Sequence, residues 1–308
     1  MKAIMYHYVR KFDPSIPNFR FLDVENFEKQ LDFFQKKFGF VTKSEWLNVV
    51  KRKKLGSAEG KVILTFDDAM SCHYDYVYKI LSSRNLWGIF YVPTLPYQKG
   101  KVLDVHRIHL LCGAFSGKQL LDALTAYLNT EMIADEKREE FRNQTYTSQD
   151  NYKGISEFKR ILNYFVSYSY RELLIDLVSN ELNYVFQTSN FYVPLDKLNQ
   201  IQLSGNIIGS HTVSHPVMSK LSTKEQNEEI EHSFSFLESN LPLNLKTYCH
   251  PYGGFHSFNE ETVRALMEQQ VAFSFNVESR DICDKDLSSA IQFLPRYDCN
   301  EFPFGKAS

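Results

Sequence analysis

No stretch of the 308-residue sequence approaches the roughly 18 consecutive apolar residues that a membrane-spanning helix needs, so no transmembrane segment is expected. A signal peptide is not expected either. The first residues, MKAIMYHYVRKFDP, contain only a short apolar stretch, interrupted by a histidine, and no small-residue cleavage site. These absences predict a soluble, cytoplasmic protein.

Cysteine is scarce, and its spacing does not suit a structural role. The sequence has 5 cysteines and no C-x-x-C pair. An odd number at wide spacing argues against a disulfide framework and against a structural zinc site, and it fits a reducing compartment. The cysteines are Cys72, Cys112, Cys249, Cys283 and Cys299.

Neither sign of charge dominates. The sequence has 35 Lys and Arg and 37 Asp and Glu, a formal net charge of -2, and its longest basic block is only residues 51–54. Nucleic acid is therefore not an expected partner. The hydrophobic share of 43% is ordinary for a globular protein, and the aromatic share of 15% suits a thick core first and a sugar-binding cleft second.

Short strand-like runs alternate with helix-like runs along most of the chain. One apolar stripe predicts a helix over residues 24–38; it consists of Phe27, Leu31, Phe34 and Phe38. Strands separated by helices predict an α/β protein with a mostly parallel sheet, open or closed into a barrel. The predicted strands are residues 3–9, 62–66, 89–92, 207–209, 246–249, 272–277 and 293–296.

Two further helices are predicted from capping boxes, in which a serine and a glutamate three residues later bond the first free N–H groups of a helix. The boxes are Ser222 with Glu225, before a helix over residues 223–240, and Ser257 with Glu260, before a helix near 258–270.

Residues 104–190 break the alternation, because they are helix-like throughout and contain little strand signal. The stretch is too long for a connection within a compact domain. We therefore expect a single domain over residues 1–308, with a helical insertion at 104–190.

Two carboxylates, Asp67 and Asp68, directly follow the predicted strand 62–66. Ligands gather at the carboxyl ends of strands in parallel α/β folds, although aspartates are also common in turns and at helix N-caps. Adjacent negative charges repel each other, and a bound cation would offset that repulsion. One carboxylate would then bind the ion, and the other would stay free as the general base for a metal-bound water.

Two histidines, His211 and His215, follow the predicted strand 207–209. Residues four apart on a helical turn lie about 5–6 Å apart on one face, close enough for two imidazoles to bind one ion. A single histidine would more often be an ordinary core or surface residue. Two histidines with one carboxylate form a facial triad that leaves coordination positions open, which is typical of a catalytic metal site.

A third stretch, residues 245–257, places Pro251, Tyr252, Gly253 and Gly254 after another predicted strand. A rigid proline before a glycine turn can direct a backbone N–H toward a developing oxyanion. Taken alone, the stretch is equally typical of an ordinary β-turn.

In this order, TFDD (65–68), H-x-x-x-H (211–215) and P-Y-G (251–253) resemble the motifs of the polysaccharide deacetylase (NodB-homology) family, carbohydrate esterase family four. The resemblance covers roughly residues 1–100 and 200–300. It implies a distorted (β/α) barrel, a divalent metal ion that is most often zinc, and hydrolysis of the N-acetyl group of an amino sugar.

The resemblance also implies roles for individual residues. Asp67 corresponds to the catalytic base, and the backbone N–H of Tyr252 corresponds to the oxyanion donor. The metal ligands would be Asp68, His211 and His215.

Two features of the family are missing. Its base-orienting arginine stands two residues before the proline, where this chain has Cys249, and Arg296 in FLPRYD is the predicted substitute. The late L-x-H motif, which supplies the general acid, is absent. His7, at the end of the first strand, is the first candidate for the proton donor and His250 the second, and for both the alternative is an ordinary buried imidazole.

His106 and His109, at the near edge of the insertion, are predicted to line the substrate cleft together with His250. The alternative for the first two is solvation, since histidines at a helix edge are often merely exposed.

The sequence thus predicts a metal-dependent deacetylase of an N-acetylated sugar. Without export, a nucleotide-linked, lipid-linked or other small glycoside is expected rather than finished cell-wall polymer. The alternatives are an amidase or deformylase that acts on a non-sugar amide, and an inactive glycan-binding protein with the same fold. An iron-dependent oxygenase is disfavoured by the histidine spacing and the paired aspartates. The oligomeric state is left open.

Overall fold

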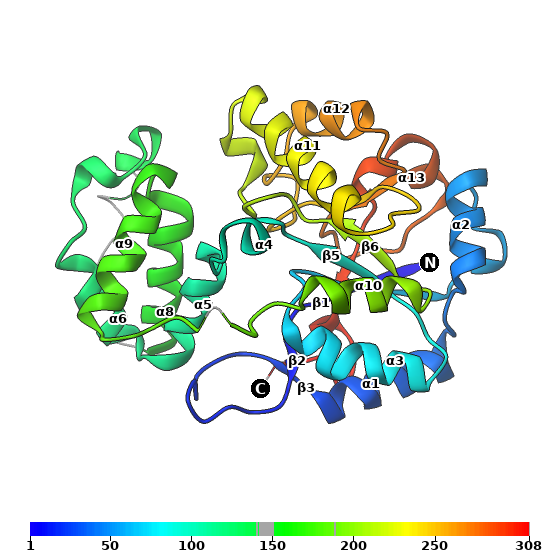
Figure 1. The fold of residues 1–308 in the computed structure, drawn as a ribbon, viewed down its shortest axis with the longest axis horizontal. Helices are drawn as coiled ribbons and strands as arrows, with labels where there is room; N and C mark the ends of the chain where they lie inside the picture. Colours follow the sequence, from blue (N-terminus) through cyan, green and yellow to red (C-terminus); the bar gives the residue numbers. More distant parts are fainter. Residues whose placement is uncertain (140, 142–150, 188, 308) are drawn as a thin grey trace. The chain divides into compact units, whose positions relative to one another are not determined.

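The computed structural model describes residues 1–139, 141, 151–187 and 189–307, which form two compact units that we treat separately (Figure 1). Unit 1 comprises Met1–Lys11, Phe21–Lys101 and Ser189–Ser308, and unit 2 comprises Phe12–Arg20 and Val102–Thr188. The single domain over residues 1–308 stays a prediction.

Unit 1 is built on a curled sheet of seven parallel strands in the order β8-β7-β6-β5-β4-β1-β9. A small second sheet pairs β2 with β3. The strands are β1 (Lys2–Tyr6), β2 (Val9–Arg10), β3 (Leu22–Asp23), β4 (Val62–Phe66), β5 (Ile89–Val92), β6 (Ile207–Ser210), β7 (Thr247–Cys249), β8 (Phe273–Phe275) and β9 (Tyr297–Asp298).

Residues 294–298 join the two ends of this sheet. Leu294 bridges Phe275 of β8, and three residues later Tyr297 pairs with Ile4 of β1, both in parallel. The sheet therefore curls back on itself, with the helices of unit 1 around it (Figure 1). The predicted distorted (β/α) barrel is confirmed.

Alternate residues of the strands pack on opposite sides of the sheet. Ile4 of β1 and Leu64 of β4 lie in a cluster with Phe27 of α1. Their neighbours Ala3 and Ile63 lie in a second cluster, which also contains residues from the far end of the sheet, Phe273 and Phe275 among them. Strands at opposite ends of the sheet thus share one interior.

The helices of unit 1 follow the pattern expected from their apolar stripes and caps. The predicted helix 24–38 is α1, and the predicted helix 223–240 is α11 with its capping box of Ser222 and Glu225. The helices are α1 (Val24–Lys37), α2 (Lys43–Arg52), α3 (Lys79–Ser83), α4 (Leu95–Lys99), α10 (Leu195–Leu203), α11 (Thr223–Asn240), α12 (Glu260–Glu268) and α13 (Asp284–Ser289), with a π-helical segment at His73–Tyr78.

Three local predictions need correction: the end of one strand, the cap of one helix, and one strand that is not formed. The strand at 3–9 ends at Tyr6, where the chain bends into β2. The helix near 258–270 begins at Glu260 and is capped by Asn259 with Thr262 rather than by Ser257 with Glu260. The predicted strand at 293–296 is not formed: a 3-10 turn ends at Phe293, Leu294 makes a single bridge to Phe275, and pairing with β1 begins only at Tyr297.

Unit 2 is helical, as predicted for 104–190. Its helices α5 (Asp104–Ala114), α6 (Gly117–Thr125), α8 (Asn151–Arg160) and α9 (Tyr168–Glu181) share an apolar core of their own. Residues 140, 142–150 and 188 of the predicted insertion lie outside the described residues. In the described part of the chain, no helix is both long and apolar enough to cross a membrane.

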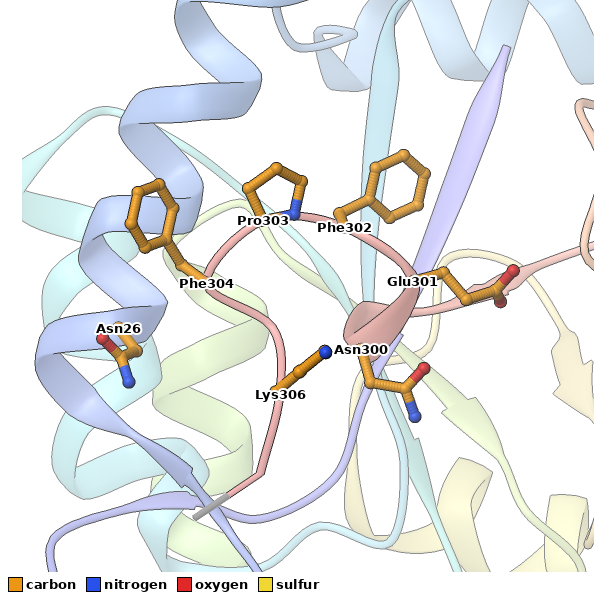
Figure 2. A pocket seen from close by; sticks show the side chains of 7 residues that line it. All are labelled: Asn26, Asn300, Glu301, Phe302, Pro303, Phe304 and Lys306. Atoms are coloured by element: carbon orange, nitrogen blue, oxygen red, sulfur yellow. The ribbon is translucent and has the colours of Figure 1, made fainter.

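The C-terminal residues of unit 1 form a hook against α1. The side-chain amide of Gln30, which is fully buried, donates to the carbonyls of Cys299 (2.9 Å) and Pro303 (3.0 Å) and so fixes the hook. A pocket beside it contains none of the predicted site residues (Figure 2). It is lined by Asn26, Asn300, Glu301, Phe302, Pro303, Phe304 and Lys306.

Candidate active site

Four strands of the barrel are followed directly by predicted site residues. His7 follows β1, Asp67 and Asp68 follow β4, His211 follows β6, and His250 follows β7. Because parallel neighbours run in the same direction, all these residues lie along the carboxyl edge of the sheet.

Asp68, His211 and His215 converge at this edge. The Asp68 Oδ1 atom lies 3.6 Å from Nε2 of His211 and 3.6 Å from Nε2 of His215. One ligand atom from each side chain lies within 4.8 Å of the other two, and all three residues are buried. Two residues about 150 positions from the aspartate thus meet it, as the sequence predicted.

This donor set fits a divalent cation. Zinc binds imidazole nitrogen and carboxylate oxygen at about 2.0–2.2 Å, which in a tetrahedron separates the ligand atoms by about 3.4 Å, close to the observed separations. His211 Nδ1 lies 2.8 Å from the carbonyl oxygen of Cys249, so Nδ1–H donates there and Nε2 keeps its lone pair facing Asp68. Burial lowers the pKa of His211, which favours the neutral, ligating form.

The two histidines meet for a different reason from the one the sequence suggested. Residues 211–215 are not helical, and the backbone instead turns through left-handed conformations at Thr212 (φ 66°) and His215 (φ 58°). The Thr212 Oγ1 atom accepts the His215 N–H at 2.9 Å, and Glu229 of α11 accepts the N–H groups of residues 213 and 214. The resulting distance between the imidazole centroids is 4.6 Å.

Asp67 forms a buried ion pair with Arg296. Nη1 and Nη2 of Arg296 each donate to one Asp67 oxygen at 2.8 Å. Arg296 is held in turn by Thr65 Oγ1 at 2.9 Å and by the carbonyl oxygen of Asn276 at 3.3 Å. The predicted substitute for the missing arginine therefore reaches the aspartate from the segment that joins the two ends of the sheet.

Cys249 belongs to the same cluster, a contact that the sequence did not predict. Its Sγ atom lies 2.8 Å from Nη2 of Arg296 and 3.4 Å from Oδ2 of Asp67. Burial raises the pKa of Cys249 well above its usual value, so the thiol keeps its proton and donates it to Asp67. The only sequence signal was that Cys249 occupies the position of the family's arginine.

The charge state of Asp67 follows from these contacts. Burial raises its pKa, but the charge and hydrogen bonds of Arg296 lower it by more, with smaller contributions from His211 and His7. The resulting pKa is about 2. The carboxylate is therefore ionised. Each of its oxygens can accept two hydrogen bonds, and Oδ1 accepts one from Arg296, so it retains a lone pair for a proton.

His7 and Tyr252 border this cluster from two other segments. His7 is half-buried, and Tyr6, the residue before it, accepts the Asp67 N–H at 3.0 Å, so His7 and Asp67 leave neighbouring strands side by side. The ring of Tyr252 lies 5.0 Å from that of His215, which places the turn at residues 251–254 beside the ligand triad.

The turn at residues 251–254 depends on glycine. Gly253 has φ 67°, and a Cβ atom there would lie 2.2 Å from Cγ2 of Val277. We predict that Gly253→Ala lowers the free energy of unfolding by about 1 to 3 kcal/mol and reduces turnover, because the turn must move. Thermal unfolding and acetate-release assays measure both effects.

Gly254→Ala is the matched control, since Gly254 has a similar φ of 77° but the added Cβ would meet only the exposed His256 side chain. A Gly253→Ala protein no less stable than the Gly254→Ala protein would contradict the requirement for close packing.

The remaining predicted residues lie in different surroundings. His250 is 1% exposed, its ring stacks on Phe258 at 3.9 Å, and its Nε2 atom lies 2.8 Å from the carbonyl oxygen of Gln292. Burial lowers its pKa to about 3. This geometry favours a packing role. In unit 2, His106 is fully buried in α5 and His109 is half-buried, and the assignment of all three histidines to substrate binding stays a prediction.

The family model for polysaccharide deacetylase matches residues 177–273, a range that contains both histidines and the turn at 251–254. The predicted family resemblance is confirmed. No curated protein sequence matches the chain.

Several solved structures have a similar fold. The Streptococcus pyogenes deacetylase PplD, in complex with acetate, is 15% identical with a TM-score of 0.60, over 97% of this chain and 91% of that one. IcaB from Ammonifex degensii is 16% identical with a TM-score of 0.52, over 96% and 90%. BC0361, a polysaccharide deacetylase from Bacillus cereus, is 12% identical with a TM-score of 0.54, and the chain covers 64% of its length. These likenesses show that the chain shares the fold of these proteins.

Proposed function

We propose that this protein is a zinc-dependent hydrolase that removes the N-acetyl group from an amino sugar. The observation that carries the proposal is the convergence of Asp68, His211 and His215 beside a separate ionised carboxylate, Asp67. A binding protein has no need for a buried ligand triad with an adjacent base, and this favours an enzyme over the glycan-binding alternative.

Asp68, His211 and His215 would hold the cation. When bound, a zinc ion would polarise the acetyl carbonyl and lower the pKa of water to about 7. The Asp67 carboxylate accepts a proton from the attacking water, and Arg296 orients it. The backbone N–H of Tyr252 donates to the carbonyl oxygen as negative charge develops there.

Cleavage of the C–N bond leaves its electron pair on nitrogen, which must gain a proton before the amine departs. His7, protonated on its imidazole, donates that proton, and the products are acetate and a free amino sugar. His7 is favoured over His250 because it is half-buried at the end of β1, directly after the residue whose carbonyl accepts the Asp67 N–H, whereas His250 is enclosed by Phe258 and the backbone near Gln292.

The proposed substrate is a small glycoside, nucleotide-linked or lipid-linked, in the cytoplasm. The test is acetate release from a panel of N-acetylated monosaccharides, nucleotide sugars, oligomers and polymers, together with N-acetyl and N-formyl amides that lack a sugar. Activity on polymer alone would overturn the substrate assignment, and activity on non-sugar amides alone would overturn the sugar assignment.

Metal removal gives a direct prediction. We expect purified protein to contain one divalent ion per chain, and we expect a chelator to abolish acetate release until Zn²⁺ is restored. His215→Ala should bind no ion under the same conditions, while His232→Ala, a surface histidine of α11, should bind it normally. Elemental analysis measures the ion, and full activity in metal-free protein would contradict the metal assignment.

A further inference from the structure

The backbone that carries His7 is bent, and the carbonyls of Tyr6, His7 and Tyr8 each have a different partner. The Asp67 N–H donates to the carbonyl of Tyr6 at 3.0 Å, and this is the last hydrogen bond between β1 and the chain that follows β4. The carbonyl of Tyr8 accepts the N–H of Leu22 at 2.8 Å, beside the small sheet of β2 and β3. His7 thus lies between two sheets and is paired by its carbonyl to neither.

The His7 carbonyl is bound instead by a buried histidine. The Nε2 atom of His73 lies 2.6 Å from it, and His73 is fully buried. Its ring lies edge-on to Phe66 of β4 and Phe90 of β5, at centroid distances of 5.7 and 6.1 Å. Burial lowers the pKa of His73 to about 4, so the ring is neutral and donates its Nε2 proton to the carbonyl.

A histidine is a costly residue in this position. The slot between two phenylalanine rings would accept an apolar side chain of similar volume, and His73 gains no second hydrogen bond there, because Nδ1 has no partner among the described residues. The imidazole therefore exchanges hydration for one contact, and that contact is to the residue proposed as the proton donor. His73 also begins the π-helical segment His73–Tyr78, an irregularity that is frequent beside functional sites.

We propose that His73 is a positioning residue, which holds the backbone of His7 so that its imidazole meets the leaving nitrogen. This inference depends on the proposed function of His7 as proton donor. Without the contact, the bend after β1 is free to shift, and the imidazole loses its alignment while the ligand triad and Asp67 stay in place.

The test is a matched pair at position 73. His73→Met fills the slot without a donor, whereas His73→Gln keeps an N–H near the position of Nε2. We expect His73→Met to lower kcat for an N-acetylated sugar about 10-fold or more, with KM and metal content unchanged, because small misalignments of catalytic groups cost that much. His73→Gln should recover most of the loss. If His73→Met does not fold, His73→Asn, which is too short to place a donor at the same point, replaces it.

Two measurements separate positioning from a general structural defect. In combination with His7→Ala, His73→Met should cause little further loss, since it acts only through His7. On 4-nitrophenyl acetate, whose leaving group departs without a proton, both single variants should lose far less activity than on the amide.

Additive losses in the double variant, or equal losses on ester and amide, would overturn the inference. So would a His73→Gln protein as impaired as His73→Met. The His7→Ala protein tests the proposed function separately, because full amide activity in that variant removes His7 as proton donor whatever the His73 variants do.

Discussion

Replacing Asp67 with Asn is expected to lower kcat for deacetylation by about 10² to 10⁴-fold, the range typical of a lost general base, while the protein still binds one metal ion. The amide is nearly the size of the carboxylate but cannot accept the proton of the attacking water. Asp68, His211 and His215 are untouched, so the ligand triad remains complete. Steady-state kinetics with elemental analysis of the same preparation measures both quantities.

Asp68→Asn is the matched control, because it alters the neighbouring carboxylate by the same change. We expect this variant to lose the metal and the activity together, since Asp68 Oδ1 is the atom that faces both histidines. We therefore expect the two variants to lose similar amounts of activity but to differ in metal content, because Asp67→Asn keeps the ion and Asp68→Asn loses it. If Asp67→Asn loses the ion, or if Asp68→Asn keeps it, the division of roles between them is wrong.

Much of the fold could be predicted because its signals are local. The strands at residues 62–66 and 89–92 match β4 and β5, since continuous apolar runs ended by turn or polar residues are typical of strands buried on both faces. The capping box before α11 could also be predicted from the sequence. The cap of α12 was not, because Ser257 and Asn259 both offer a suitable side chain and only the backbone of the turn before it selects Asn259.

The sequence predicted which residues form the ligand triad better than it predicted the backbone that brings them together. Strand ends placed the aspartates and His211 at one edge, but the left-handed turn that brings in His215 has no pattern in a single sequence. His73 was missed entirely, because its contact is with a backbone carbonyl 66 positions away and its neighbours in sequence carry no motif. Such contacts follow from tertiary packing, which local periodicity does not encode.

Arg296→Met is expected to lower the free energy of unfolding by about 3 to 5 kcal/mol, the usual effect of breaking a buried ion pair by removing one partner. Both side chains of the pair are almost completely buried, at 1% and 2% exposure, so Asp67 would be left as an uncompensated charge. Turnover should fall as well, because the guanidinium group that orients the Asp67 carboxylate is gone. Chemical unfolding and acetate release measure the two effects.

A double variant distinguishes loss of the ion pair from loss of packing around Arg296. If the penalty arises from the charge left on Asp67, Arg296→Met combined with Asp67→Asn should be more stable than Arg296→Met alone, since neither charge remains. Arg296→Lys keeps the charge but not the two parallel hydrogen bonds, and it should retain stability better than activity. A double variant no more stable than Arg296→Met would assign the penalty to packing, and an active Arg296→Met protein would show that Asp67 is oriented without the arginine.

The pair spans 229 positions and depends on residues 294–298, so its loss would also test whether that segment holds the ends of the sheet together.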